Sequence, residues 1–446
     1  MKITWDSGDS WFDRSYAVEN SDGENIREFQ DQPTLDELRK IERQHGEATE
    51  RLDLWQSGLL CTSCNTEIND RFAATTKGDL CCWDCAMDRE STDQQGITIN
   101  TDPTKSVMSE SQLHKKSLCD HVINVATGCR HGCEFCYVPT TPAIDNRKEM
   151  LAEQANIDDP QADWGKYLLY RDDLPERLAR VLKKRDPEAR KQTRRGRGIV
   201  MLSSGTDCYQ DRRTAQISRG VIIELIKHGI PVRVLTRSPA VARDVDLFQK
   251  AGERIAVGSS IPSFEAPLVR AIEPGAPSPM TRWGALDDLQ QEGIPVYVSM
   301  SPTYPLMDED DFHELLSYFR ALGEIVVFHE PINPRGSNFQ QCLEAVEKAG
   351  YDDVATEFRK MRDNHQYWVE YAIEQIRTVQ RVATRFDGLE VHSWPDNQLI
   401  RTTSGQLRSR LRDMQQAVSP ESFSGHTPEK SPAQSAIELK TGSTYD

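Results

Sequence analysis

The sequence is short of positive charge and of long apolar runs. Its 54 Lys and Arg residues are set against 70 Asp and Glu residues, which gives a net charge of −16. This surplus of negative charge argues against a protein that simply coats nucleic acid or an anionic membrane. No apolar run approaches the length of a membrane span, and the amino terminus lacks the apolar stretch of a signal peptide. We therefore predict a cytoplasmic protein without membrane segments.

Eleven cysteines in such a chain indicate metal or redox chemistry rather than a disulfide framework. Three of them, Cys129, Cys133 and Cys136, stand at C-x3-C-x2-C spacing beside two glycines. Thiolates this close together can converge on one iron–sulfur cluster, and three ligands on a four-iron cube leave one iron open to a small molecule. The alternatives are a structural zinc or cluster site, or three unrelated thiols.

Four other cysteines form two C-x2-C pairs separated by a spacer of 17 residues: Cys61, Cys64, Cys82 and Cys85. Each pair can bind one metal ion from a tight turn, which is the pattern of a zinc ribbon or treble clef. Cys81 could replace Cys82 as a ligand. The sequence therefore predicts a four-thiolate zinc site, and the alternative is a cysteine cluster that binds nothing.

The composition divides the chain into five segments. We predict an acidic, partly disordered segment over 1–50, the zinc module over 51–92, a polar linker over 93–115, one large domain over 116–408 and a disordered tail over 409–446.

Within 116–408, short apolar runs alternate with helical patterns. The predicted strands are 121–126, 198–203, 231–235, 255–260, 295–300, 324–328 and 389–392, and the predicted helices include 174–184, 214–228, 280–291, 310–322 and 353–385. This alternation indicates an α/β fold with a parallel sheet, and about six such units would form a partial (β/α)6 barrel. The chemistry of such barrels sits at the carboxyl ends of the strands, where six of these strands are followed by polar residues and where the cysteine loop lies.

The order of motifs from Gly128 to Pro331 resembles the radical SAM superfamily, in particular the group similar to spore photoproduct lyase. The matching pieces are the cysteine loop with Tyr137 after it, Thr206-Asp207-x-Tyr209-Gln210, Thr236-Arg237-Ser238-Pro239, Ser260-Ile261, Glu273-Pro274-x-Ala276-Pro277-Ser278-Pro279 and the Gly-Ile-Pro strand entry at 293–295. The resemblance covers about half of the chain and leaves out the zinc module and both ends.

The resemblance implies a radical SAM barrel in which Cys129, Cys133 and Cys136 hold a 4Fe–4S cluster and the open iron takes the amino and carboxylate groups of S-adenosylmethionine (SAM). Reductive cleavage of SAM would give a 5′-deoxyadenosyl radical that takes hydrogen from a substrate. The implied SAM contacts are Phe135 with the adenine, Arg237 with the carboxylate, and Ser260, Ser203, Ser204 and Asp207. Tyr137 and Cys208 are the candidate catalytic residues.

Two departures bear on the reaction. The lyase group has a hydrogen-donor cysteine where this chain has Ser204, and Cys208 falls four residues later, which argues against photoproduct repair. After the cluster loop only Cys208 and Cys342 remain, too few for an auxiliary cluster. That count disfavours the peptide-maturing enzymes with cysteine-rich carboxyl-terminal domains.

The implied partners are an external electron donor, such as a ferredoxin or flavodoxin, and a macromolecular substrate, with nucleic acid ahead of protein. A basic run at 183–197 suggests a nucleic-acid patch, but a helix-to-strand loop lies on the face opposite the site, so a solvated surface is the simpler interpretation. The alternative function is a nucleic-acid or protein adaptor in which the zinc and the cluster are only structural.

Overall fold

The computed structural model describes residues 2–6, 15–19, 25–29, 96–113, 118–184, 198–202 and 204–417. Several predictions lie outside these residues: the zinc site with Cys61, Cys64, Cys82 and Cys85, the SAM contact Ser203, most of the basic run, and the tail from residue 418 onward.

The main sheet is built from parallel strands. In the part of the chain that is described, it runs in the order β14-β13-β12-β11-β10-β9-β6-β5, and only the pairing of β5 with β6 is antiparallel. The strands are β5 (Ser109–Glu110), β6 (His121–Ile123), β9 (Val200–Leu202), β10 (Val232–Thr236), β11 (Ile255–Ser260), β12 (Val296–Thr303), β13 (Ile325–Pro331) and β14 (Leu389–Ser393). The predicted α/β class with a parallel, radical SAM-like sheet is confirmed, and each of the seven predicted strands has a counterpart in this sheet.

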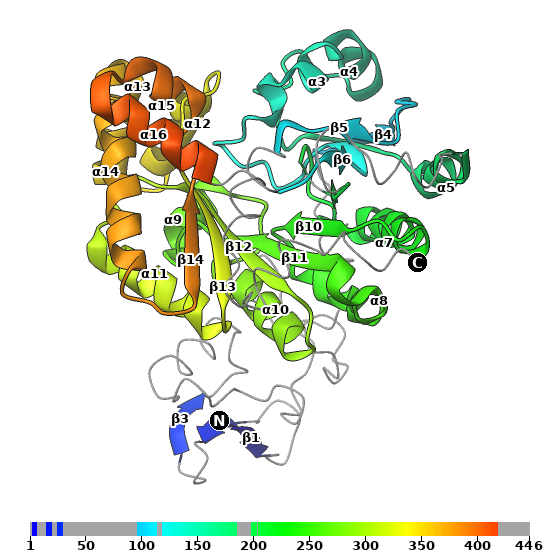
Figure 1. Ribbon diagram of the computed structural model, residues 1–446, viewed down its shortest axis with the longest axis horizontal. Coiled ribbons are helices and arrows are strands. Elements are labelled where there is room, and N and C mark those ends of the chain that lie inside the picture. The colour runs from blue at the N-terminus through cyan, green and yellow to red at the C-terminus, as the bar shows by residue number, and fades with distance from the viewer. Residues whose placement is uncertain are drawn as a thin grey trace.

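Helices cover the outer face of this sheet, as Figure 1 shows. They are α5 (Leu174–Lys184), α7 (Arg212–Lys227), α8 (Val245–Ala251), α10 (Pro279–Gln291), α11 (Glu309–Ala321) and α14 (His365–Ala383). The largest hydrophobic core lies between the two layers, where Val234 and Val298 of the sheet meet Leu225 and Leu316 of the helices. Most positions of these strands are buried, which is why the sequence reveals them as short apolar runs.

The predicted helix over 353–385 is two helices. Helix α13 (Asp352–Asp363) ends at Asn364, whose backbone is extended, and α14 begins directly after it. The Asn364 side chain accepts hydrogen bonds from the backbone N–H groups of Gln366 and Tyr367, which caps the new helix.

A second sheet stands beside the cysteine loop. The predicted first strand splits, so that β6 joins the main sheet while β7 (Ala126–Gly128) pairs with β8 (Tyr167–Tyr170), which pairs with β4 (Thr98–Thr101). Strands β4 and β5 lie in the segment that the sequence predicts to be a linker, so 98–101 and 109–110 belong to the two sheets. The side chains of β4 are all exposed, and its pattern therefore carries no hydrophobic signal.

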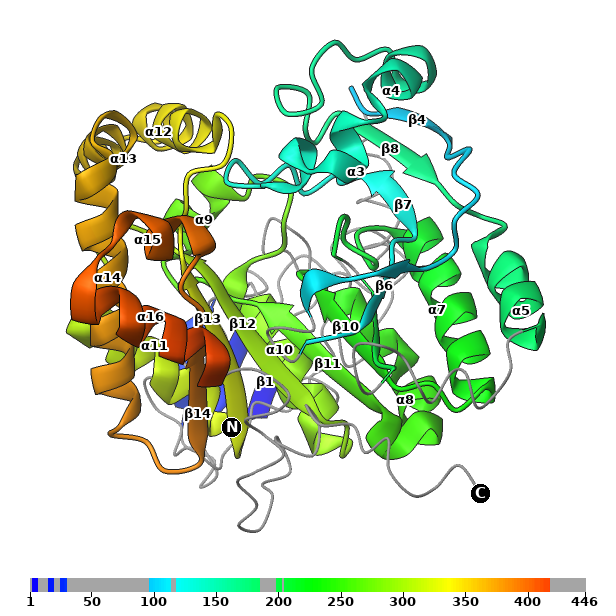
Figure 2. The same ribbon diagram turned by 45° about the horizontal axis from the view of Figure 1, so that its top comes forward.

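The remaining described elements lie around these two sheets. They are the 3-10 helices η3 (Val138–Thr140), η4 (Pro239–Asp244) and η5 (Gly252–Arg254), and the helices α3 (Pro142–Asp145), α4 (Lys148–Ala155), α9 (Ala266–Ile272), α12 (Asn338–Lys348), α15 (Asn397–Thr402) and α16 (Gly405–Ala417). Figure 2 shows α12 and α13 on one side, and α3 and α4 on the other side, of the same end of the molecule.

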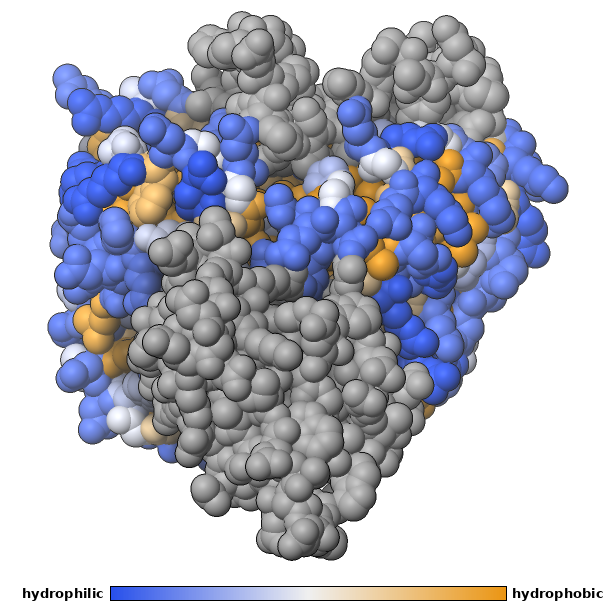
Figure 3. Space-filling model, turned by 90° about the horizontal axis from the view of Figure 1, so that it is seen from below, coloured by the Kyte–Doolittle hydropathy of each residue, from blue (hydrophilic) through white to orange (hydrophobic). Residues whose placement is uncertain are grey.

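The two ends of the chain carry more structure than expected. Three antiparallel strands, β1 (Lys2–Asp6), β2 (Ser15–Glu19) and β3 (Asn25–Phe29), form a sheet inside the segment predicted to be loose. Helix α16 passes the predicted boundary at residue 409, so the tail begins no earlier than residue 418. Among the described residues, the face seen in Figure 3 is mainly hydrophilic, and its hydrophobic side chains lie in small groups.

Candidate active site

The cysteine loop begins where strand β7 ends, and two glycines allow its backbone to pack tightly. Gly128 has a φ of 90°, and a Cβ atom there would lie 2.1 Å from the carbonyl oxygen of Tyr167. On the other side, Gly275 donates its N–H to the carbonyl of His131 at 3.0 Å. A Cβ atom on Gly275 would come within 2.4 Å of the Arg130 carbonyl. The loop is therefore held between β8 and the segment after α9.

The three thiols of the loop are poorly accessible to water. Cys129 is 8% exposed and Cys133 is 7% exposed, while Cys136 is half-buried. Burial raises the pKa of Cys129 to about 12, and burial followed by the charge on Cys133 raises the pKa of Cys136 to about 12. These thiols are neutral at pH 7 unless a metal cation compensates the charge of the thiolates.

The surroundings of the thiols fit an iron–sulfur cluster. The hydroxyl of Tyr167 is buried without a hydrogen-bond partner, and Cys136 and Cys129 both act electrostatically on it. A buried donor without an acceptor is costly, and a sulfur atom of a cluster would supply an acceptor. Across the described residues, no three His, Cys, Asp or Glu side chains converge closely enough to hold one metal ion, so the thiols are not arranged around a single ion.

The Thr-Asp-x-Tyr-Gln segment at 206–210 holds the cysteine loop through hydrogen bonds. The Gln210 side-chain oxygen accepts the backbone N–H of Arg130 at 2.7 Å. The Gln210 amide donates to the hydroxyl of Thr206 at 2.8 Å, and that hydroxyl donates to the carbonyl of Gly128. Two residues of one motif therefore fix both sides of Cys129, a role that the sequence does not reveal.

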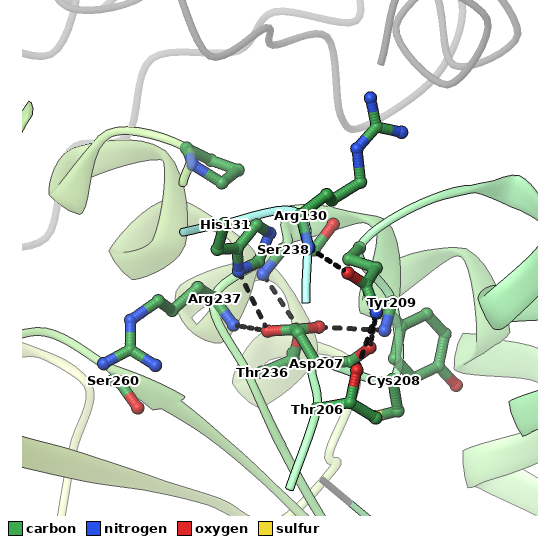
Figure 4. A network of polar contacts seen from close by, with 12 residues as sticks. Arg130, His131, Thr206, Asp207, Cys208, Tyr209, Thr236, Arg237, Ser238 and Ser260 are labelled. Carbon is green, nitrogen blue, oxygen red and sulfur yellow. Dashed lines mark hydrogen bonds and ion pairs between the residues drawn. The ribbon is translucent and has the colours of Figure 1, made fainter. Parts of the chain in front are cut away.

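Asp207 is the centre of the polar network in Figure 4. It accepts hydrogen bonds from the backbone of Tyr209 at 2.9 Å, the hydroxyl of Thr236 at 2.6 Å and the backbone of Arg237 at 2.7 Å. His131 lies 3.6 Å away, but burial lowers its pKa to about 4, so this contact is not an ion pair at neutral pH. Asp207, which the resemblance implies as a SAM contact, accepts these three hydrogen bonds from the backbone and from Thr236.

Arg237 extends away from Asp207 on the side of Ser260 (Figure 4). Its Nε donates to a carboxylate oxygen of Glu273 at 3.1 Å, and its Cζ lies 5.4 Å from the ring centroid of Phe135. Two predicted cofactor contacts are therefore neighbours, although they stand about 100 residues apart in the chain. The structure also gives Arg237 an acidic partner, Glu273, whose side chain is fully buried.

Glu273 was missed as a functional residue, although its motif belongs to the resemblance. Besides Arg237 it meets Arg282, whose Nη2 is 2.6 Å from Oε2, and the hydroxyl of Tyr304, which donates to Oε1 at 2.8 Å. Burial by itself raises the pKa of Glu273, but Arg282 and then Arg237 outweigh burial and lower it. Glu273 is therefore an ionised carboxylate in the interior.

Three further predicted site residues, Ser260, Ser204 and Tyr137, differ in burial and in their contacts. Ser260, at the end of β11, is buried near this network, and its carbonyl accepts from Arg282 at 2.9 Å. Ser204 contacts the side chain of Asn124 at 3.4 Å. Tyr137 is 48% exposed beside the loop.

Cys208, the second candidate catalytic residue, lies in the interior. Its side chain is 0% exposed within the core between the sheet and the helices, and its sulfur lies 4.0 Å from the carbonyl of Leu235. A thiol in that position does not reach a substrate at the mouth of the barrel, so we assign Cys208 no part in the reaction.

None of the described helices is both long and apolar enough to cross a bilayer.

The segment that carries the cysteine loop matches a known protein family. A model described as the radical SAM superfamily matches residues 123–319, which begin at the end of β6 and extend into α11. The chain therefore contains a radical SAM domain over these residues, and this domain indicates an enzyme of the radical SAM class.

Similar chains occur in a virus, an archaeon and bacteria, and each of them is described as an uncharacterized protein. The chain is 29% identical over 245 residues to the uncharacterized protein ORF301 of Acidianus two-tailed virus, covering 53% of this chain and 76% of that protein. It is 26% identical over 274 residues to the uncharacterized protein MJ0683 of Methanocaldococcus jannaschii, covering 61% and 90%. The uncharacterized protein Rv2578c of Mycobacterium tuberculosis is 25% identical over 249 residues, covering 54% and 67%.

Solved structures give weaker likenesses. A spore photoproduct lyase variant with bound AdoMet and dinucleoside spore photoproduct aligns at a TM-score of 0.48 and 16% identity, over 68% of this chain and 83% of that one. SuiB of Streptococcus suis bound to S-adenosylmethionine aligns at 0.37 and 12% identity, over 63% and 51%. At these TM-scores the likenesses say nothing of reaction or substrate.

Proposed function

We propose that this enzyme holds a 4Fe–4S cluster on Cys129, Cys133 and Cys136 and uses it to cleave SAM reductively. The observation that carries the proposal is the group of three poorly accessible thiols on one clamped loop, with the unpartnered hydroxyl of Tyr167 beside them. When bound, the reduced cluster supplies the electron that breaks a carbon–sulfur bond of SAM. An external electron donor must reduce the cluster between turnovers.

The residues of the chain bind and orient the cofactor. The ring of Phe135 offers a flat apolar surface for the adenine, and Arg237 next to it offers a planar guanidinium to the carboxylate. Ser260 ends β11 and Ser204 follows β9, the two parallel strands on either side of β10, and we place contacts with the rest of SAM at these carboxyl ends. Asp207 acts indirectly, because it holds the backbone of Arg237.

The substrate approaches from the side of Tyr137. The acidic Glu330 and the basic Arg335 both act electrostatically on Tyr137, so charges of both signs lie near this exposed ring. We propose that Tyr137 takes part in hydrogen transfer with a macromolecular substrate. Nucleic acid is the first class to test, since paired-cysteine zinc modules are frequent in proteins that bind it.

The test is anaerobic reconstitution with iron and sulfide, addition of SAM and a strong reductant, and measurement of 5′-deoxyadenosine. We expect the wild-type protein to form this product and Cys136→Ala to form none. Cys208→Ala is the control, because it removes a thiol from the core, outside the cluster loop, and should retain the activity. A wild-type protein with a full cluster that forms no 5′-deoxyadenosine would contradict the proposal.

A further inference from the structure

Glu273 is a buried carboxylate for which the proposed function has no direct use. It lies directly after α9 and is 0% exposed. An ionised carboxylate is stable in an interior only when other groups compensate its charge, so its partners indicate what it does. Three side chains reach it, and they differ in how freely they can move.

Two of these partners keep Glu273 in place. Arg282 is 0% exposed, and it donates to the carbonyl of Pro277 at 2.8 Å and to that of Ser260 at 2.9 Å. With Arg282 tied to the backbone at two points, its contact with Oε2 of Glu273 is fixed as well. The hydroxyl of Tyr304 holds the other oxygen of the carboxylate. Rotation of Glu273 would break one of these contacts.

The third partner, Arg237, stands at the edge of the buried group. Its side chain is 19% exposed, whereas that of Glu273 is 0% exposed. Glu273 takes the Nε edge of the guanidinium, and Asp207 takes the backbone N–H of the same residue. No described residue accepts a hydrogen bond from the two Nη groups at the tip of Arg237, so these groups are available to a ligand, and a planar carboxylate fits their geometry.

We propose that Glu273 is a positioning residue that aims the guanidinium of Arg237 at the carboxylate of SAM. This inference rests on the proposed function, in which Arg237 is the carboxylate ligand. Glu273 itself does not touch SAM, because Arg282, Tyr304 and Arg237 surround its oxygens. The opposite possibility is competition, in which Glu273 occupies Arg237 and weakens SAM binding.

The experiment measures the dissociation constant of SAM on the cluster-loaded protein by equilibrium dialysis, for wild type, Glu273→Gln, Arg237→Ala and the double variant. We expect Glu273→Gln to weaken SAM binding about tenfold, and the double variant to bind no worse than Arg237→Ala, because neighbours in one network do not act additively. Methylthioadenosine lacks the carboxylate and the amino group of SAM. Its dissociation constant should be the same in all four proteins, a result that a merely structural role of Glu273 would not give.

Asp244→Asn is the matched control. Asp244 is also a buried carboxylate that accepts from a tyrosine hydroxyl and from an arginine, here Tyr209 and Arg219, both at 2.7 Å. It lies on the helix side of the sheet, so Asp244→Asn should lower the melting temperature of the apo-protein without changing SAM binding. If Glu273→Gln fails to fold, Tyr304→Phe loosens the same carboxylate, and we expect a smaller loss of SAM affinity.

The outcomes separate this inference from the proposed function. Unchanged SAM binding in Arg237→Ala would contradict the proposed role of Arg237. Weaker binding in Arg237→Ala with unchanged binding in Glu273→Gln would overturn the positioning role alone. Tighter binding of SAM by Glu273→Gln would show competition and would also overturn it, as would an equal loss of methylthioadenosine and SAM binding.

Discussion

At the scale of single residues, the network around Asp207 shows what the sequence predicts and what it does not. The resemblance assigns both Phe135 and Arg237 to SAM, and in the structure the Cζ atom of Arg237 lies 5.4 Å from the ring centroid of Phe135. The partners of these residues could not be predicted, because Glu273 reaches Arg237 only through the tertiary fold. The burial of Cys208 could not be predicted for a related reason: one residue along a loop decides whether a side chain faces the mouth or the core.

The cluster ligands give the first prediction at this scale. Replacing Cys129, Cys133 and Cys136 together by Ala should abolish the cluster absorbance and the bound iron and sulfide, because these thiols are the proposed ligands. The measurement is iron and sulfide content after anaerobic reconstitution. A triple variant that still binds four irons per chain would show that the ligands lie elsewhere.

A second residue-scale prediction concerns Gly275. A Cβ atom there would lie 2.4 Å from the Arg130 carbonyl and 3.0 Å from His131, both backbone contacts, so Gly275→Ala must shift the cysteine loop. We expect a loss of about 1–3 kcal/mol in the free energy of unfolding and a lower cluster content.

Gly293→Ala serves as the control for Gly275→Ala. Gly293 also resists substitution because its φ is 75°, but a Cβ atom would meet nothing within 4 Å. That variant should lose about 1 kcal/mol of stability from backbone strain and keep its cluster. Equal cluster content in both variants would contradict the account of the loop.

At the scale of elements, the buried strands and the amphipathic helices were the predictable part. Strand β11 was predicted with the bounds that the structure shows, Ile255–Ser260, and so was α5, Leu174–Lys184. Strand β4 could not be predicted, because pairing with β8 and not burial forms it. The break between α13 and α14 depends on one capping side chain inside a continuous helical pattern.

That cap gives a prediction at the element scale. Asn364→Ala removes the acceptor of the Gln366 and Tyr367 N–H groups and should cost about 1 kcal/mol in the free energy of unfolding. Asn364→Asp keeps an acceptor at the start of α14 and should retain the wild-type stability. Urea unfolding of the apo-protein followed by circular dichroism measures both. Equal destabilisation by the two substitutions would rule out the cap as the cause.

At the scale of the whole molecule, the radical SAM domain and the paired cysteines before it are two separate metal-binding predictions. We propose that Cys61, Cys64, Cys82 and Cys85 bind one structural zinc, independently of the cluster loop. The full chain with Cys61 and Cys64 replaced by Ala should lose zinc and keep its iron, whereas the triple variant of the cluster loop should lose iron and keep zinc. Metal analysis of both proteins is the measurement, and zinc that stays bound in the first would refute this site.

The central claim is that one iron of the cluster is open and binds SAM. The most direct measurement is the electron paramagnetic resonance spectrum of the reduced, reconstituted protein, recorded with and without SAM. A cluster held by three cysteines should change its signal when SAM binds, because the amino and carboxylate groups become ligands of the fourth iron. An adaptor with a structural cluster fully coordinated by protein should give the same spectrum in both samples, and that result would contradict the account.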